Sequence, residues 1–222
     1  MSRWEIQIAL LISAGVVAIS IPPASAVESA PGVALAVLET LPVKGRAAKT
    51  GYSRGAFGQR WADVDRNGCD TRNDILKRDM TSIVYKAKTR NCVVLSGTLI
   101  DRYSGETINF VRGDVSSMEV QIDHVVALSN SWQTGAFKLS ITQRTALAND
   151  PLNLFAVKGR LNSQKSDGDA ATWLPPMKSF RCAYVAQQIA VKAKYSLWVV
   201  PPEKAAMLSI LAKCPTQKLP VS

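Results

Sequence analysis

The chain has 222 residues, with 27 Lys and Arg against 17 Asp and Glu, one His, and a formal net charge of +10. Hydrophobic residues make up 47% of it and charged residues 20%, which excludes an intrinsically disordered protein and predicts one globular domain with extensions. The excess of positive charge favours an anionic partner, such as nucleic acid, anionic lipid or an acidic polymer of the cell surface.

Residues 1–26 have the features of an export signal. The apolar stretch 8–21 is shorter than the roughly 20 residues that a membrane span needs. A small-x-small pattern predicts cleavage after Ala26, which would give a secreted, extracellular protein without stable membrane association. An uncleaved N-terminal anchor is the alternative, because Glu5 offsets the positive charge of Arg3 in the n-region.

Residues 27–52 are rich in Ala, Pro and Gly and predict a flexible N-terminal lead-in before a main domain over 53–222. Within this domain we expect, in chain order, a helix, a β-hairpin, a strand that continues the same sheet, two short helices, another strand, a helix and a C-terminal helix pair. The expected ranges are 72–85; 92–100 with 106–113; 117–128; 129–137 and 141–150; 152–157; 158–166; and 182–193 with 207–214.

Export makes the four cysteines a disulfide framework, because oxidising compartments preserve disulfides. Cys182 begins one amphipathic pattern and Cys214 ends the next, and two helices joined by a short connection pack antiparallel. Among the three possible pairings, this arrangement favours Cys182–Cys214 and leaves Cys69 with Cys92. A metal site built from these cysteines is disfavoured, since the sequence has no Cys-x-x-Cys pair.

The stretch DVDRNGCDTRND is similar to an EF-hand calcium loop, because it places Asp63, Asp65 and Asn67 before Gly68. Its twelfth position is Asp74 and not the usual bidentate Glu. A tight Asn-Gly turn is the better interpretation, and calcium binding is the alternative.

The single histidine lies in the stretch QIDHVVALS. Neighbouring side chains of a strand point to opposite faces, so Asp123 and His124 can share one pocket only if the strand bends or ends there. A second strand, LNLFAV, precedes a helix on which Asn162 and Lys165 share a face. The order of strand, strand and helix predicts a ββα unit.

The stretches IDHVVALS, DPLNLFAV and RLNSQKSDGD resemble the HNH endonucleases, also called ββα-metal or His-Me finger nucleases. With the flanking GCDTRNDIL, DGDAATWLPP and RCAYVA, the chain is similar to a family of exported bacterial HNH-type nucleases over roughly residues 50–215. The resemblance implies an α+β fold. Its ββα-metal core would span about 118–168, with an extra β-hairpin, a C-terminal helical hairpin and two disulfides.

The resemblance also implies a role for each matching residue. His124 matches the general base that takes a proton from the attacking water, although a buried structural histidine is the alternative. Asp123 and Asn162 match the metal ligands, and Asn153 matches an Asn that supports the site through backbone hydrogen bonds. Because the two ligands offer only oxygen, one Mg²⁺, or Mn²⁺ in its place, is expected to stabilise the leaving oxygen.

Arg72 and Lys165 are the candidate contacts to the substrate phosphate. Ordinary roles are the alternatives: a helix cap or turn for Arg72 and its neighbour Asp70, and a solvated lysine for Lys165. The resemblance implies metal-dependent hydrolysis of phosphodiester bonds in nucleic acid with little sequence preference. DNA is the expected substrate, and RNA is the alternative. The alternatives are an exported basic protein that binds nucleic acid or envelope polyanions without turnover, and a phosphodiesterase for small molecules.

Overall fold

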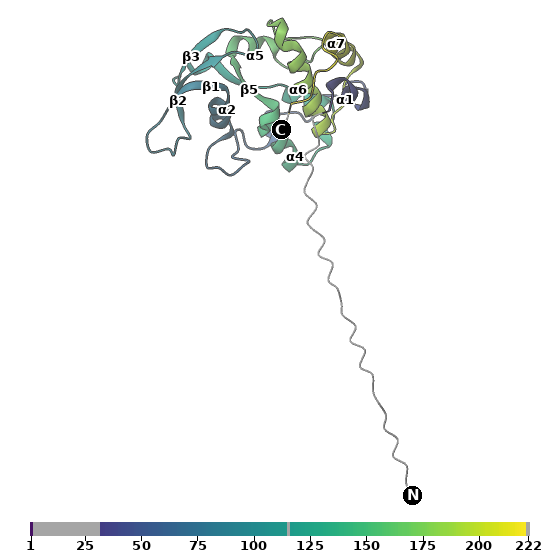
Figure 1. The fold of residues 1–222 in the computed structure, drawn as a ribbon, viewed down its shortest axis with the longest axis horizontal. Helices are drawn as coiled ribbons and strands as arrows, with labels where there is room; N and C mark the ends of the chain where they lie inside the picture. The colour runs from purple at the N-terminus through teal and green to yellow at the C-terminus, as the bar shows by residue number, and fades with distance from the viewer. Residues whose placement is uncertain (2–31, 115, 221–222) are drawn as a thin grey trace. The chain divides into compact units, whose positions relative to one another are not determined.

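The computed structural model of the chain describes residues 1, 32–114 and 116–220 (Figure 1). The predicted export signal and its cleavage site lie outside these residues, apart from Met1. Within the described ranges, none of the helices combines the length and the apolar composition that a membrane crossing requires.

Three strands form an antiparallel sheet in the order β1-β2-β3: β1 (Met80–Tyr85), β2 (Val94–Ile100) and β3 (Thr107–Val111). The pair β2–β3 is the predicted hairpin. The helix predicted over 72–85 is wrong in its second half, because α2 (Thr71–Asp79) ends where β1 begins. Three of the six residues of β1 are β-branched, and such residues lose side-chain freedom in a helix but pack well on a pleated surface.

A separate two-stranded antiparallel sheet carries the histidine. It consists of β4 (Val120–His124) and β5 (Leu154–Lys158), and His124 pairs with Leu154. The prediction that the strand with His124 continues the sheet of the hairpin is therefore wrong. β5 leads directly into α5 (Gly159–Lys165), so these three elements have the predicted ββα order.

Two helices connect β4 to β5, namely α3 (Leu128–Gln133) and α4 (Ile141–Asn149). α4 begins at a capping box, in which Ser140 and Gln143 satisfy each other's backbone N–H groups. Short 3-10 helices complete the chain: η1 (Arg54–Phe57), η2 (Ser116–Met118), η3 (Ala136–Lys138), η4 (Pro151–Asn153) and η5 (Lys178–Phe180).

The predicted C-terminal helix pair is formed by α6 (Arg181–Lys194) and α7 (Pro201–Leu211). Helix α1 (Ala34–Thr40) packs against both, as Figure 1 shows. Two of its side chains are fully buried in this contact, Ala34 and Leu38. Within the predicted flexible lead-in of 27–52, the segment Ala34–Thr40 is thus a helix whose apolar face is buried in the core. Residues 27–31 lie outside the described ranges.

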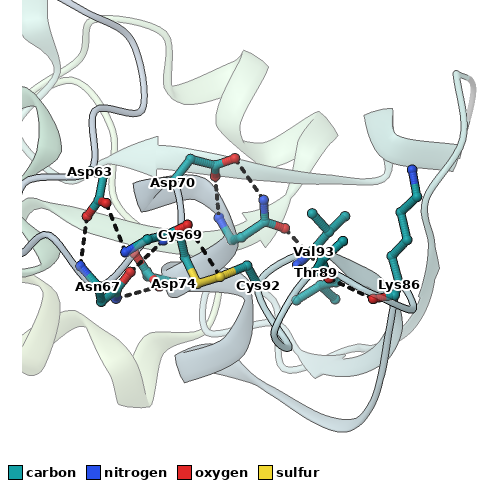
Figure 2. The surroundings of a disulfide bond; sticks show 12 residues. Asp63, Asn67, Cys69, Asp70, Asp74, Lys86, Thr89, Cys92 and Val93 are labelled. Atoms are coloured by element: carbon teal, nitrogen blue, oxygen red, sulfur yellow. Dashed lines mark hydrogen bonds between the residues drawn. A yellow bond between two sulfur atoms is a disulfide. The ribbon is translucent and has the colours of Figure 1, made fainter.

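Both predicted disulfides are confirmed. Cys69–Cys92 joins the loop before α2 to the loop before β2, as Figure 2 shows, and Cys182–Cys214 joins the start of α6 to the segment after α7. The second pairing follows from the antiparallel packing of the two helices, which brings their outer ends together.

The carboxylates of the calcium-like loop accept hydrogen bonds from other groups of the same loop (Figure 2). Asp63 accepts hydrogen bonds from the backbone N–H groups of Asn67 at 3.1 Å and Gly68 at 2.9 Å, and the Asn67 amide donates to Asp74 at 3.1 Å. Gly68 has a φ of 88°, the left-handed conformation that a tight Asn-Gly turn requires. These contacts favour the tight turn over a calcium site.

Candidate active site

Strand β4 places Asp123 and His124 in different surroundings. The strand continues through His124 and does not end before it, so successive side chains point to opposite faces. Both residues are buried, with exposed fractions of 4% and 8%. A shared pocket for the two polar groups is therefore not formed, contrary to the expectation from the sequence.

Asp123 belongs to a buried polar cluster. Its Oδ1 accepts a hydrogen bond from Nζ of Lys165 at 2.9 Å, and its Oδ2 accepts one from the hydroxyl of Tyr103 at 2.5 Å. Lys165 Nζ also donates to the backbone carbonyl of His124 at 2.8 Å. Burial raises the pKa of the Asp123 carboxyl, although Lys165 and Tyr103 act in the opposite direction. The cluster ties α5 to the end of β4.

These contacts bear on two of the predicted roles. The Lys165 side chain is fully buried, so the predicted contact to a substrate phosphate is not available to it. Asp123 is 4% exposed and its oxygens already accept hydrogen bonds from the Lys165 ammonium and the Tyr103 hydroxyl, which disfavours a metal ion at this carboxylate. In the part of the chain that the structure describes, no three or more His, Cys, Asp or Glu side chains gather in a way that could hold a metal. A divalent metal therefore remains a prediction that depends on Asn162.

The imidazole of His124 is oriented by a backbone carbonyl. Its Nε2 lies 2.9 Å from the carbonyl oxygen of Ala148, and since a carbonyl only accepts, Nε2 carries the proton in this hydrogen bond. In the neutral ring, Nδ1 is then the nitrogen with a free lone pair. The indole of Trp61 stacks on the imidazole, with ring centroids 6.1 Å apart and an interplanar angle of 9°.

The surroundings of His124 also fix its charge. Burial is the main cause that lowers the pKa of the imidazole to about 3. The Ala148 carbonyl opposes this effect, and the positive charges of Arg54, Lys165 and Arg60 add to it. The ring is therefore neutral at pH 7.

Asn153 connects the segment after β4 with the end of α4. Its Oδ1 accepts a hydrogen bond from the backbone N–H of Val126 at 2.8 Å, and its Nδ2 lies 3.3 Å from the carbonyl oxygen of Leu147. The residue is fully buried. Because Leu147 precedes the carbonyl that orients His124, these contacts help to fix the position of the imidazole.

An arginine-lined hollow of about 590 Å³ extends from the vicinity of Trp61 to α5. A second hollow of about 580 Å³ shares Arg54, Gln121 and Asn162 with it. In the lining that the two hollows share, Nδ2 of Asn162 donates a hydrogen bond to Oε1 of Gln121 at 2.8 Å. We call the first hollow the arginine groove. Its lining includes Arg54, Arg60, Trp61, Arg72, Arg112, Gln121 and Asn162.

Arg72, a predicted phosphate contact, faces this groove. Its Nη2 lies 3.3 Å from the backbone oxygen of Val120. Burial lowers the pKa of its guanidinium, and the positive charges of Arg112 and Arg60 lower it further. A bound phosphate would relieve this crowding of like charges. Asp70, by contrast, caps α2 by accepting a hydrogen bond from the backbone of the third helical residue.

Three residues around His124 were not predicted, namely Arg54, Arg60 and Trp61. They come from the stretch SRGAFGQRW, far from the ββα unit in sequence. The available signal was the mixture of basic and aromatic residues in this stretch, which is typical of contacts to nucleic acid.

Comparison with known proteins places the chain in a nuclease family. Residues 70–210 match the family model described as GmrSD restriction endonucleases, C-terminal domain, which is more than half of the chain. The chain belongs to this family, and the nuclease-family membership that the resemblance implied is confirmed. The chain is also 35% identical over 197 residues to an uncharacterized secreted protein of Arthroderma benhamiae, a fungus, with 88% of each chain covered. No solved structure matches.

Proposed function

We propose that the protein is an exported nuclease of the HNH type that hydrolyses phosphodiester bonds in nucleic acid with little sequence preference. The observation that carries this proposal is the placement of His124: its Nε2 is held by the Ala148 carbonyl, and its ring lines a pocket that shares Arg54 and Arg60 with the arginine groove. Membership of a family described by restriction endonucleases supports nucleic acid as the substrate.

In this proposal, His124 is the general base. With its Nε2–H group held by Ala148, Nδ1 would accept a proton from the water that attacks the phosphorus. The bond from the phosphorus to the 3′-oxygen would break at the same time, and the leaving oxygen would take a proton from solvent. The arginine groove would bind the phosphate and stabilise the negative charge that grows on it. Phosphate binding would also offset the charges of Arg54 and Arg60, which lower the pKa of the imidazole, and would so make it a stronger base.

The proposed cofactor is Mg²⁺, or Mn²⁺ in its place. Asn162 is the predicted ligand that lines the groove, and its amide oxygen suits a hard cation. The ion pair between Asp123 and Lys165 argues against a ligand role for Asp123. When bound, such an ion would stabilise the leaving oxygen.

Export is proposed on three observations: the predicted signal at 1–26, the two disulfides, and a relative whose name describes a secreted protein. Disulfides persist in oxidising compartments and are rare in the cytosol. DNA is the proposed natural substrate because of the restriction endonucleases in the family description.

The test is cleavage of plasmid DNA and single-stranded DNA in Mg²⁺, with and without EDTA. We expect His124→Ala to lower the rate by roughly 10²- to 10⁴-fold, the usual contribution of a general base. The control is Lys213→Ala, which changes an exposed lysine after α7 and should leave the rate unaltered. Gel retention of DNA without cleavage by the unaltered protein would support the binding protein and refute the nuclease. Cleavage that survives EDTA would refute only the requirement for a metal and would leave the proposed nuclease function standing.

A further inference from the structure

A small apolar pocket of about 150 Å³ lies beside His124. Its apolar lining comes from Phe57, Trp61, Leu128 and Ala148. An apolar cavity of roughly 150 Å³ is large enough to bind benzene, whereas sites for drug-sized ligands have roughly 300–1,000 Å³. The pocket therefore fits one flat ring and is too small for an extended ligand. We call it the ring pocket.

The ring pocket adjoins the arginine groove. Arg54, Arg60 and Trp61 line both of them. A ligand that fills both must carry an apolar ring close to negative charge. A nucleotide within a chain has this combination, because its base is joined through the sugar to phosphates on either side.

One wall of the ring pocket is held in place before any ligand binds. The Trp61 indole contacts the His124 imidazole, and the guanidinium of Arg60 lies 5.3 Å from the centroid of the indole ring.

Two side-chain amides line the ring pocket, those of Gln59 and Asn149, and the Asn149 amide is already used by the protein. Asn149 Oδ1 accepts a hydrogen bond from the backbone N–H of Ala62 at 3.0 Å. Its Nδ2 donates to the carbonyl of Thr145 at 2.9 Å and lies 3.3 Å from that of Gln59. This amide therefore does not read the edge of a base. Apolar and aromatic contacts do not select a base by its hydrogen-bonding edge, because every base has an apolar face.

We propose that the ring pocket receives one unpaired base next to the scissile phosphate, so that the protein cleaves single-stranded nucleic acid in preference to duplexes. This inference rests on the proposed nuclease function. In a duplex the bases are stacked and paired, and a base must be flipped out at an energetic cost before it can enter a pocket. A single strand avoids this cost.

The experiment uses the unaltered protein and three end-labelled DNA substrates of one sequence: a single strand, its blunt duplex, and the single strand with one central abasic nucleotide. We expect faster cleavage of the single strand than of the duplex. At the phosphates that flank the abasic nucleotide, we expect a loss of roughly 5- to 150-fold, the range that one base–aromatic contact gives. Cleavage at distant positions of the same strand serves as the internal control.

A variant links this loss to the ring pocket. In Trp61→Ala, the overall rate will fall because Trp61 contacts His124, but the ratio between intact and abasic positions should move close to one. In Lys213→Ala the ratio should match that of the unaltered protein. Combining the change in the protein with the change in the substrate isolates the interaction between Trp61 and the base.

The outcomes separate the two proposals. Equal cleavage of the single strand and the duplex, without an effect of the abasic nucleotide, would overturn the proposed binding of a base in the ring pocket. The proposed nuclease function would be unaffected by this result. Absence of cleavage on every substrate would refute the nuclease. Binding of the intact and abasic strands, measured by fluorescence anisotropy in EDTA, would then still decide the ring pocket: equal affinity overturns it, and weaker binding of the abasic strand supports it.

Discussion

The ion pair between Lys165 and Asp123 can be tested by removal of the lysine charge. Lys165→Met keeps most of the volume of the side chain and leaves the carboxylate of Asp123 buried without its partner. The structure places the two charged atoms 2.9 Å apart, with exposed side-chain fractions of 0% and 4%. If Lys165 were a phosphate contact, as the sequence suggested, the same change would lower activity with little effect on folding.

The expected magnitude follows from this burial. Breaking a buried pair by removal of one partner costs about 3–5 kcal/mol, because the remaining charge is neither solvated nor paired. For a protein of this size, about 1 kcal/mol corresponds to a change of roughly 2–4 °C in Tm. We therefore expect Lys165→Met to lower the Tm by roughly 6–20 °C. The double variant Lys165→Met/Asp123→Asn should recover part of this loss, since no charge then remains buried.

A matched control is the exposed pair of Lys49 and Asp167. Its charged atoms are 2.6 Å apart, but its side chains are 55% and 44% exposed. Such pairs contribute about 0–1 kcal/mol, so Lys49→Met should hardly change the Tm. The assay is thermal and urea unfolding of all variants at pH 7. Equal stability of Lys165→Met and Lys49→Met, together with a large loss of cleavage in Lys165→Met, would refute the stabilising role of the buried pair. It would support Lys165 as a contact to the substrate phosphate instead.

Three further predictions concern other parts of the molecule. Because the pKa of His124 is about 3 in the folded protein and about 6.5 in the unfolded chain, only the unfolded chain gains this proton as the pH falls through that window. This group should thus leave the free energy of unfolding unaffected above pH 6.5 and lower it by up to about 1.4 kcal/mol per pH unit below that pH. In urea titrations at pH 7, 5 and 4, His124→Phe should therefore lose less stability on acidification than the unaltered protein. Cys182→Ala/Cys214→Ala should lower the free energy of unfolding in urea by roughly 3–4 kcal/mol, because the disulfide closes a loop between residues 32 apart and so restricts the unfolded chain. An unchanged midpoint of unfolding would contradict this. Arg72→Ala should weaken DNA binding and reduce the slope of log Kd against log salt concentration by about 0.7–0.9, the effect of one lost phosphate contact, whereas an unaltered slope would place Arg72 outside the phosphate path.

Features that depend on local sequence could be predicted. The hairpin of β2 and β3 follows from two apolar runs around a turn, and the order of β4, β5 and α5 follows from periodicity. The pairing of Cys182 with Cys214 required only that two neighbouring helices pack antiparallel. In these cases the partners are close in the chain or their geometry is fixed by a short connection.

Features that depend on distant partners could not be predicted. The segment 80–85 is a different case, because its partner β2 follows after a short loop; here the β-branched residues and the pairing with β2 outweigh the helical pattern. Arg54, Arg60 and Trp61 reach His124 from a stretch that precedes it by most of a domain, and no local pattern assigns them to the site. From the sequence, Lys165 is a candidate phosphate contact or a solvated lysine, but α5 packs this side of the helix onto the core.

The adjacent Asp and His of β4 illustrate why a motif does not by itself assign chemistry. The alternation of a strand sends Asp123 to the face that α5 covers, where Lys165 binds both the carboxylate and the carbonyl of His124. The same alternation turns the imidazole toward Trp61 and the Ala148 carbonyl. The acid thereby fixes the backbone from which the histidine projects, although the two side chains lie on opposite faces. Substitution of Asp123 should consequently disturb the position of the imidazole as well as the stability of the fold, even if no metal ever binds to its carboxylate.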